Sequence, residues 1–481
     1  MQNNSNRRFL QGKLLLFSMI LPLLLSSCGQ TLKQTVSTPM KTVTARIIPT
    51  PTTATNDPGG SSDNNTVQVT VANGIAYVGT SNQDIYALRA NNGSLFWHAR
   101  VEGSVQELPL IEHGIVYISS LVGQGGPAYL SALRTSDGIL LWRYRSNSYI
   151  YQPVVGNNQL YIGEQKDGIT ALQVNNGKTV WHVTGATNQS PSLFNNTLYA
   201  SISSFTQADG VYALRTKDGS VLWNYQTTAA STLTIQGGVI YTCCLQGVFS
   251  ALRISNGHLI WSKALDITFT SEPKFVDGAI YLMTTKISLE VPTTASRAQG
   301  FRPPFLAVGQ LLGGNSKVSN TLPLKTGKTS LYALRVDDGA LLWQQSLQDN
   351  ESFSGSFQIS QGIIYTSVMS VQTQNSMILT ALQSSDGRTI WQDKLEGDAN
   401  GLILNEDVLY TIGAADKSAL YALNMKDGRT LWSHSINANT YNQPELIEHT
   451  QILISANNGI IYTLRADTGA LLWQYQTYTS S

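Results

Sequence analysis

Charged side chains are scarce in this sequence of 481 residues, since Asp, Glu, Lys and Arg make up only 13% of it, about half of the average share. The 31 basic and 30 acidic residues leave a formal net charge of +1. A nucleic-acid-binding protein needs a basic surface to displace counterions, so this balance argues against that class. The 42% of hydrophobic residues argues against an acidic disordered chain.

Other chemical signatures are missing as well. The six histidines have no metal-ligand spacing, and no Gly-rich phosphate loop precedes a helix. No EF-hand loop and no Ser-His-Asp order are present. We therefore predict no metal site from these motifs.

The apolar run at residues 14–25 is about a dozen residues long, too short to cross a bilayer. Basic residues precede it, which is typical of a signal peptide. It ends in Leu25-Ser26-Ser27-Cys28, which resembles the bacterial lipobox, where the cysteine is lipidated before cleavage. We expect a signal peptide at residues 1–27 and an anchor at Cys28 on the cell membrane or outer membrane, outside the cytoplasm. The alternative is an ordinary secretory signal.

Residues 29–66 contain ten Thr, three Ser and four Pro and show no hydrophobic period. Such a segment buries too little surface to offset its conformational entropy. We expect residues 28–66 to be the lipidated cysteine followed by a disordered tether.

From residue 67 onward the sequence repeats. Each copy contains an Ala-Leu pair (once Thr-Leu), a Gly six residues after the first member of that pair, and a Trp four residues after the Gly. Every tryptophan of the protein belongs to a copy: Trp97, Trp142, Trp181, Trp223, Trp261, Trp343, Trp391, Trp432 and Trp473.

The turns of the repeat predict its strands. Asn or Asp precedes the Gly in eight copies, which is the strongest short hairpin signal. A second turn lies upstream and is followed by Tyr in eight units and by Leu453 in the ninth. Each unit of about 41 residues, a length typical of structural repeats, is therefore four antiparallel strands, a to d.

Strand c is apolar on both faces, so it lies between two sheets. Small Ala opposite bulky Trp suits face-to-face packing of four-stranded blades, with the Trp of one blade docked against the thin strand of the next. The predicted fold is an all-β β-propeller at residues 67–481. Nine repeats indicate eight or nine blades.

The pattern Y-A-L-x-x-x-x-G-x-x-x-W resembles the tryptophan-docking repeat of the pyrroloquinoline-quinone (PQQ) type propellers, the quinoprotein alcohol dehydrogenase-like superfamily. The resemblance covers residues 67 to about 477. It implies the propeller fold. Members include PQQ- and calcium-dependent dehydrogenases and non-enzymatic proteins, such as the propeller lipoprotein of the outer-membrane β-barrel assembly machine, so fold alone does not decide function.

Residues 285–329 interrupt the sixth unit and read as an insertion in its b–c loop. The a–b and c–d turns lie on one face of such a blade, and the b–c and d–a connections lie on the other. We place the binding surface on the second face. Phe301, Arg302, Phe305 and Leu306 form a candidate docking element there, and an incidental disordered loop is the alternative.

Cys243 and Cys244 follow strand b of the fifth unit. Their adjacency resembles the vicinal disulfide that covers the quinone in PQQ dehydrogenases, and the alternative is a pair of small buried thiols. Glu164 is a weak candidate for a calcium ligand, with no matching Asn or catalytic Asp motif after it, and is expected to be an exposed loop residue.

Catalysis is disfavoured because all nine tryptophans are committed to blade packing, which leaves none as an aromatic floor for a quinone. We expect a non-catalytic, monomeric scaffold without a cofactor, with a protein partner on the b–c and d–a loops and no nucleic acid. The alternatives are a dehydrogenase that uses PQQ and Ca²⁺, and a cell-surface sensor or carbohydrate-binding protein.

Overall fold

The structure is a computed structural model that describes residues 67–477 except 124, 204–208, 228–229, 245–246, 266–268, 290–323, 349–350, 354–356, 371–375, 415–417, 437, 439 and 441–442. Within these residues every regular element is a β-strand, from β1 to β39. None of them forms a helix long and apolar enough to span a membrane. The expected signal peptide, Cys28 and the tether lie outside the described residues.

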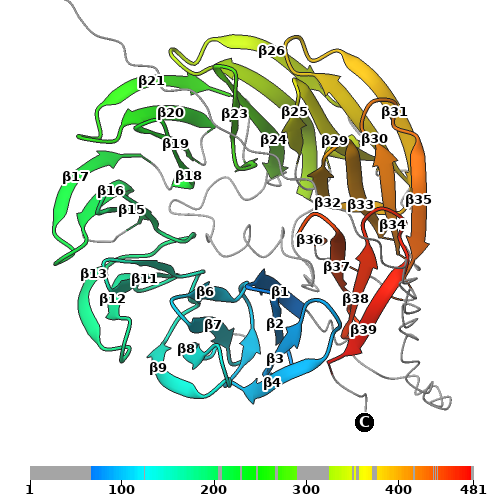
Figure 1. Ribbon diagram of the computed structural model, residues 1–481. Helices are drawn as coiled ribbons and strands as arrows, with labels where there is room; N and C mark the ends of the chain where they lie inside the picture. The colour runs from blue at the N-terminus through cyan, green and yellow to red at the C-terminus, as the bar shows by residue number, and fades with distance from the viewer. Residues whose placement is uncertain are drawn as a thin grey trace, which may run out of the picture. The chain divides into compact units, whose positions relative to one another are not determined.

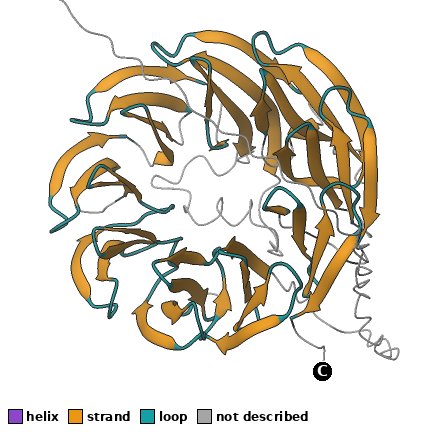
Figure 2. Ribbon diagram, viewed as in Figure 1, coloured by secondary structure: helices purple, strands orange, loops and turns teal. Residues whose placement is uncertain are grey.

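Nine antiparallel sheets follow one another along the sequence and form a ring, each built from one continuous stretch of residues (Figure 1). Strand a of each sheet lies toward the centre, and strand d lies at the perimeter. Figure 2 shows that only strands and their connections make up the described ring. The all-β propeller prediction is confirmed, and of the two blade counts predicted, nine is correct.

The strand bounds follow the repeat from blade to blade. Blades 1 to 3 contain β1 (Val67–Ala72), β2 (Ile75–Thr80), β3 (Asp84–Arg89), β4 (Leu95–Arg100); β5 (Ser104–Val105), β6 (Leu110–Glu112), β7 (Ile115–Leu121), β8 (Ala128–Arg134), β9 (Leu140–Ser146); and β10 (Val154–Gly156), β11 (Gln159–Glu164), β12 (Gly168–Gln173), β13 (Thr179–Thr184). Blades 4 to 6 contain β14 (Ser192–Phe194), β15 (Thr197–Ile202), β16 (Gly210–Arg215), β17 (Val221–Gln226); β18 (Ala230–Gln236), β19 (Val239–Cys244), β20 (Val248–Arg253), β21 (Leu259–Ala264); and β22 (Phe269–Thr270), β23 (Lys274–Val276), β24 (Ala279–Leu289), β25 (Leu324–Arg335), β26 (Leu341–Ser346). Blades 7 to 9 contain β27 (Glu351–Phe353), β28 (Gln358–Ser360), β29 (Ile363–Ser370), β30 (Ser376–Gln383), β31 (Thr389–Glu396); β32 (Asp398–Asn405), β33 (Val408–Ala414), β34 (Ala419–Asn424), β35 (Thr430–Ser435); and β36 (Glu445–Ile447), β37 (Gln451–Ser455), β38 (Ile460–Arg465), β39 (Leu471–Gln476).

Strand a is the irregular strand of the blade. In blades 2, 6 and 7 it consists of two short segments that pair with the same strand b. Proline has no N–H to donate to a ladder, so it weakens pairing at the position it occupies. In five blades, the part of strand a that leads into the a–b turn begins directly after a proline. These prolines are Pro109, Pro153, Pro191, Pro273 and Pro444.

The hydrophobic core is divided among the blade interfaces. Nine clusters of buried side chains are present, and each contains residues from two neighbouring blades. Strand c buries both faces, as its apolar pattern predicts, and strand b does so as well. Each blade is therefore stabilised chiefly by its two neighbours.

Each repeat tryptophan donates a hydrogen bond from Nε1 to a backbone carbonyl of the next blade. The acceptors are the carbonyls of Thr135, Val174, Thr216, Ile254, Val336, Ser384, Met425, Ala466 and Ala90, at 2.7–3.2 Å. The last of these joins Trp473 of blade 9 to blade 1, so the same contact closes the ring.

The indole ring packs on the glycine of the next c–d turn. Gly177 has φ +67°, and a Cβ there would lie 2.5 Å from Cε3 of Trp142. The corresponding glycine of every other blade meets its tryptophan in the same way. The docking partner is thus this turn, a correction to the expected thin strand, because the repeat Ala pairs with the Trp of its own blade, as Ala87 does with Trp97.

The blade 6 insertion is shorter than expected. The insertion was predicted at residues 285–329, but β24 continues to Leu289 and β25 begins at Leu324. The two strands stay paired to their ends, at Leu289 and Leu324. Residues 290–323, which include Phe301, Arg302, Phe305 and Leu306, lie outside the described residues.

Candidate functional site

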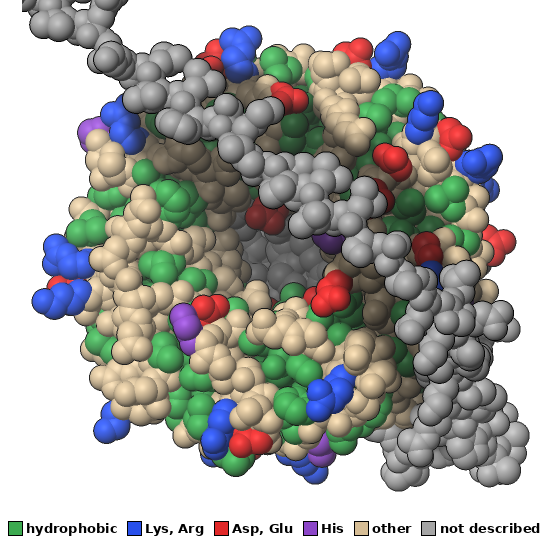
Figure 3. Space-filling view, in the orientation of Figure 1, with side chains coloured by type: hydrophobic (Ala, Val, Ile, Leu, Met, Phe, Trp, Pro, Cys, Tyr) green, Lys and Arg blue, Asp and Glu red, His purple; other side chains and the backbone are tan. Residues whose placement is uncertain are grey.

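The alternating strand directions define two faces. We call the face with the a–b and c–d turns the turn face, and the face with the b–c and d–a connections the loop face. Lys and Arg side chains gather around the perimeter of the molecule in Figure 3, while uncharged polar and hydrophobic residues make up most of the face in view. On this face the basic side chains are therefore spread along the rim rather than gathered in one patch.

Cys243 and Cys244 are the last two residues of β19, rather than residues beyond it. Cys243 is fully buried and packs with Tyr241, Phe249 and Trp261 in the interface between blades 5 and 6. The side chain of Cys244 lies outside the described residues, so the vicinal disulfide stays a prediction.

Glu164 is not an exposed loop residue, as the sequence led us to expect. It ends β11 and only 2% of its surface is exposed. Tyr144, from strand d of blade 2, donates a hydrogen bond to Oε1 at 3.2 Å. The hydroxyl of Thr170 donates to Oε2 and lies 2.9 Å from Nδ1 of His182. A buried carboxylate is stable only when its oxygens are hydrogen-bonded, and this network supplies that need.

The quinone and calcium of the PQQ dehydrogenases do not fit the described residues. Both oxygens of Glu164 already accept hydrogen bonds from protein hydroxyls. Among the residues that the structure describes, no three His, Cys, Asp or Glu residues come together as a metal site would require. The nine indoles are held between blades, so none is available as a floor under a cofactor.

A cluster that the sequence did not reveal lies on the inner side of blades 2 and 3, toward the loop face. We call Glu107, Tyr149 and Tyr151 the Tyr149 cluster. The Tyr149 hydroxyl donates to Oε1 of Glu107 at 2.7 Å, and the two tyrosine rings meet edge to face with centroids 5.0 Å apart. All three residues are half-buried.

Local pairing explains how these tyrosines are presented. Ile150 bridges to Glu164 and is buried, so Tyr149 and Tyr151 share the opposite side of the extended backbone. The only sequence signal was the Tyr-Ile-Tyr alternation before Pro153, which the repeat pattern does not include.

Burial dominates the electrostatics of the Tyr149 cluster. It raises the pKa of Glu107, and the hydrogen bond from Tyr149 opposes that rise. Burial and then the Glu107 carboxylate raise the pKa of Tyr151 to about 12 and raise the pKa of Tyr149 further. Glu107 has no cationic partner among the described ion pairs, so a basic group from outside would stabilise its charge.

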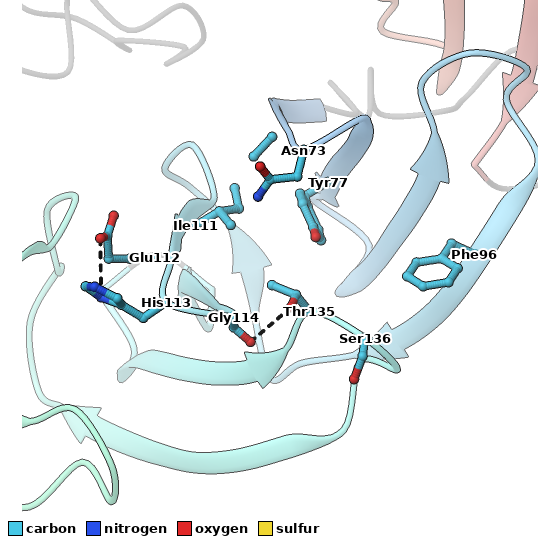
Figure 4. A pocket seen from close by; sticks show the side chains of 10 residues that line it. Asn73, Tyr77, Phe96, Ile111, Glu112, His113, Gly114, Thr135 and Ser136 are labelled. Atoms are coloured by element: carbon cyan, nitrogen blue, oxygen red, sulfur yellow. Dashed lines mark hydrogen bonds and ion pairs between the residues drawn. The ribbon is translucent and has the colours of Figure 1, made fainter.

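The turn face carries a groove between blades 1 and 2, with a volume of about 390 Å³ (Figure 4). We call it the turn groove; Asn73, Phe96, Glu112, His113 and Ser136 are among its lining residues. The Phe96 ring is stacked under the Arg89 guanidinium at 4.8 Å, and Glu112 lies 3.3 Å from Nδ1 of His113. The groove thus combines the aromatic rings of Tyr77 and Phe96 with amide, carboxylate and imidazole groups.

The nine tryptophan-docked blades define a propeller of the PQQ type. The family model described as outer membrane protein assembly factor BamB matches residues 54–190, 119–300 and 327–481. These segments span most of the sequence, and the protein therefore belongs to this family.

Individual relatives are distant. Outer membrane protein assembly factor BamB of Yersinia pestis is 24% identical over 215 residues, covering 41% of this chain and 52% of the relative. Tetrathionate hydrolase of Acidithiobacillus ferrooxidans is 23% identical over 233 residues, covering 46% of this chain and 42% of the relative. The match thus spans about half the length of these curated relatives.

Solved structures to which the chain is similar include the following two. BamB from Moraxella catarrhalis has a TM-score of 0.48 and 15% identity, covering 72% of this chain and 93% of that chain. Quinohemoprotein alcohol dehydrogenase from Comamonas testosteroni has a TM-score of 0.48 and 14% identity, covering 79% and 75%.

Proposed function

We propose that this protein is a non-catalytic, lipid-anchored propeller that works outside the cytoplasm as a protein-binding platform, with the loop face as its binding surface. The observation that carries the proposal is the family match across most of the sequence, to a model described as an outer-membrane protein assembly factor. The proposed anchor is Cys28, with residues 28–66 as the tether.

The ring supports this function physically. Interlocked blades hold the ends of their strands in fixed positions, and a preorganised surface loses little conformational entropy on binding. Tyrosines are favoured at the centre of protein interfaces, where each supplies a large area and a polar end. The Tyr149 cluster adds a half-buried carboxylate, so we propose that a basic side chain of the partner docks there.

The test is crosslinking in membranes of cells that produce the full-length protein. A photoreactive residue on the loop face should capture a protein partner, and the double substitution Tyr149→Ala with Tyr151→Ala should weaken capture about 30-fold, as expected for hot-spot aromatics. Phe96→Ala, on the turn face, is the matched control and should leave capture unchanged. Equal capture by all three proteins would contradict the loop-face assignment.

The anchor has its own test. Cys28→Ser should release the protein from membranes and remove the mass of the lipid, because the serine hydroxyl does not replace the thiol in this modification. A variant that remained membrane-bound without the lipid would show that another part of the protein holds it there.

The dehydrogenase alternative rests on Cys243 and Cys244, and calorimetry separates it from the platform. We expect no calcium-dependent PQQ binding by residues 29–481 produced in an oxidising compartment, and no dye-linked alcohol oxidation. Tight, calcium-dependent binding would favour the enzyme. A carbohydrate-binding role would instead use the turn groove, and loss of sugar binding in Phe96→Ala would identify it.

A further inference from the structure

Asn-Gly pairs are the points at which a protein backbone most readily rearranges without an enzyme. The glycine nitrogen loses its proton and attacks Cγ of the asparagine, the bond from Cγ to Nδ2 breaks, and ammonia leaves. Water then opens the resulting cyclic imide at either carbonyl, which yields aspartate or isoaspartate. The sequence contains six such pairs: Asn73-Gly74, Asn92-Gly93, Asn176-Gly177, Asn256-Gly257, Asn400-Gly401 and Asn458-Gly459.

In four of these pairs the attacking nitrogen is engaged. The N–H groups of Gly93, Gly177, Gly257 and Gly459 donate hydrogen bonds of 2.8–2.9 Å to backbone carbonyls. The first three glycines are also pressed against the tryptophan of the preceding blade. Breaking the hydrogen bond and moving the glycine must precede attack, so the fold slows the reaction at these sites.

The pair Asn73-Gly74 lacks this protection. It forms the two-residue turn between β1 and β2, where Ala72 pairs with Ile75. Both turn residues are exposed and have positive φ, 51° and 71°. A Cβ on Gly74 would meet nothing within 4 Å, and no hydrogen bond from the Gly74 N–H occurs among the described residues.

We propose that Asn73 is a site of spontaneous deamidation in the folded protein, which adds a carboxylate to the turn groove. Asn73 lines the groove together with Glu112 and His113 (Figure 4), so the product gives the groove a second carboxyl group. The isoaspartate product also adds a backbone methylene to the tightest turn of blade 1. This modification is independent of the function proposed for the loop face.

The three protected pairs that lie under a tryptophan are controls within the same molecule. The full-length protein is incubated in mildly alkaline buffer, and peptides are mapped by mass spectrometry with aspartate and isoaspartate products separated. We expect conversion at Asn73 to exceed that at Asn92, Asn176 and Asn256 about tenfold, the factor that one ordinary hydrogen bond supplies. In guanidinium, where the fold is lost, the rates should converge.

Two results would overturn the proposal. One is conversion at Asn73 no faster than at the three docked turns in the folded protein. The other is an unchanged preference for Asn73 in guanidinium, which would assign the effect to local sequence rather than to the fold. Asn73→Gln should abolish the product peptides without altering the fold, and it confirms their assignment.

Discussion

The single glycine of each c–d turn has two separate roles, which substitutions can distinguish. Gly177 needs a positive φ, and it also needs to be small because it lies under Trp142. Gly278 has a similar φ of +75°, but a methyl group added there would meet nothing within 4 Å. We expect Gly278→Ala to cost about 1 kcal/mol of backbone strain, and Gly177→Ala about 2–4 kcal/mol through added overpacking. Equal shifts in denaturation midpoint would contradict the docking role.

Half-buried Tyr144 and fully buried Tyr117 both pack between blades 2 and 3 and differ in the hydrogen bonding of their hydroxyls, so they can be compared. Tyr144 donates to Glu164 across the interface of blades 2 and 3, whereas the hydroxyl of Tyr117 is buried with no partner among the described residues. We expect Tyr144→Phe to lower the free energy of unfolding by about 1.5–3 kcal/mol, the range for bonds to charged groups. Tyr117→Phe should be neutral or stabilising. Chemical denaturation of both variants measures the difference.

At the scale of elements, the sequence predicted the features that recur in every repeat and missed those that depend on contacts with the adjacent blade. Trp142 and Gly177 lie at repeat positions, so the pattern predicted that the indole docks on the next blade and that the glycine forms a turn, but not that the indole rests on that turn. Glu164 follows an apolar strand and looks solvent-exposed, but Tyr144 from the adjacent blade covers it. The Tyr149 cluster was missed because strand a and the d–a connections vary between units and carry no period.

The extended hairpin of β24 and β25 in blade 6 allows a test of whether the stability of the propeller depends on residues 290–323. Because β24 and β25 remain paired to Leu289 and Leu324, the two strands can be joined there without 290–323. We expect replacement of 290–323 by a two-residue Asn-Gly turn to leave the denaturation midpoint unchanged or raise it slightly, since closing a shorter loop costs less entropy. A large loss of stability would show that 290–323 contributes to the propeller core.

At the scale of the molecule, the contact between blades 9 and 1 is the one blade interface that no described segment of the chain crosses, and we call it the seam. Trp473 docks on Gly93, the Tyr86 hydroxyl donates to the carbonyl of Thr477, and Glu445 accepts a 2.9 Å hydrogen bond from the N–H of Val71. Neither blade adds a strand to the other blade's sheet. Contacts made by side chains therefore close the ring.

Glu445 should make closure of the seam depend on pH. Burial raises its pKa above the ordinary value for Glu, against the hydrogen bond from Val71, and Oε2 has no partner among the described residues. At pH values between the pKa of Glu445 in the unfolded state and its higher pKa in the folded state, the folded protein binds more protons than the unfolded protein. The free energy of unfolding therefore falls as the pH rises through this range. Below the unfolded pKa the contribution is fully present.

The variant Glu445→Gln tests this linkage because its carbonyl can still accept the bond from Val71 while its charge is gone. We expect denaturation midpoints of the native protein to fall from mildly acidic toward neutral pH more steeply than those of Glu445→Gln. Glu272→Gln, which removes an exposed carboxyl group, controls for the change in net charge.

Hydrogen exchange locates the effect in the structure. In the native protein, we expect the exchange rates of backbone amides in β1 and β36 to rise with pH by more than the intrinsic pH dependence of exchange. Glu445→Gln should remove this additional rise in β1 and β36 and leave the other strands unchanged. Equal suppression in all nine blades would mean that the carboxylate acts on the whole ring rather than on its seam.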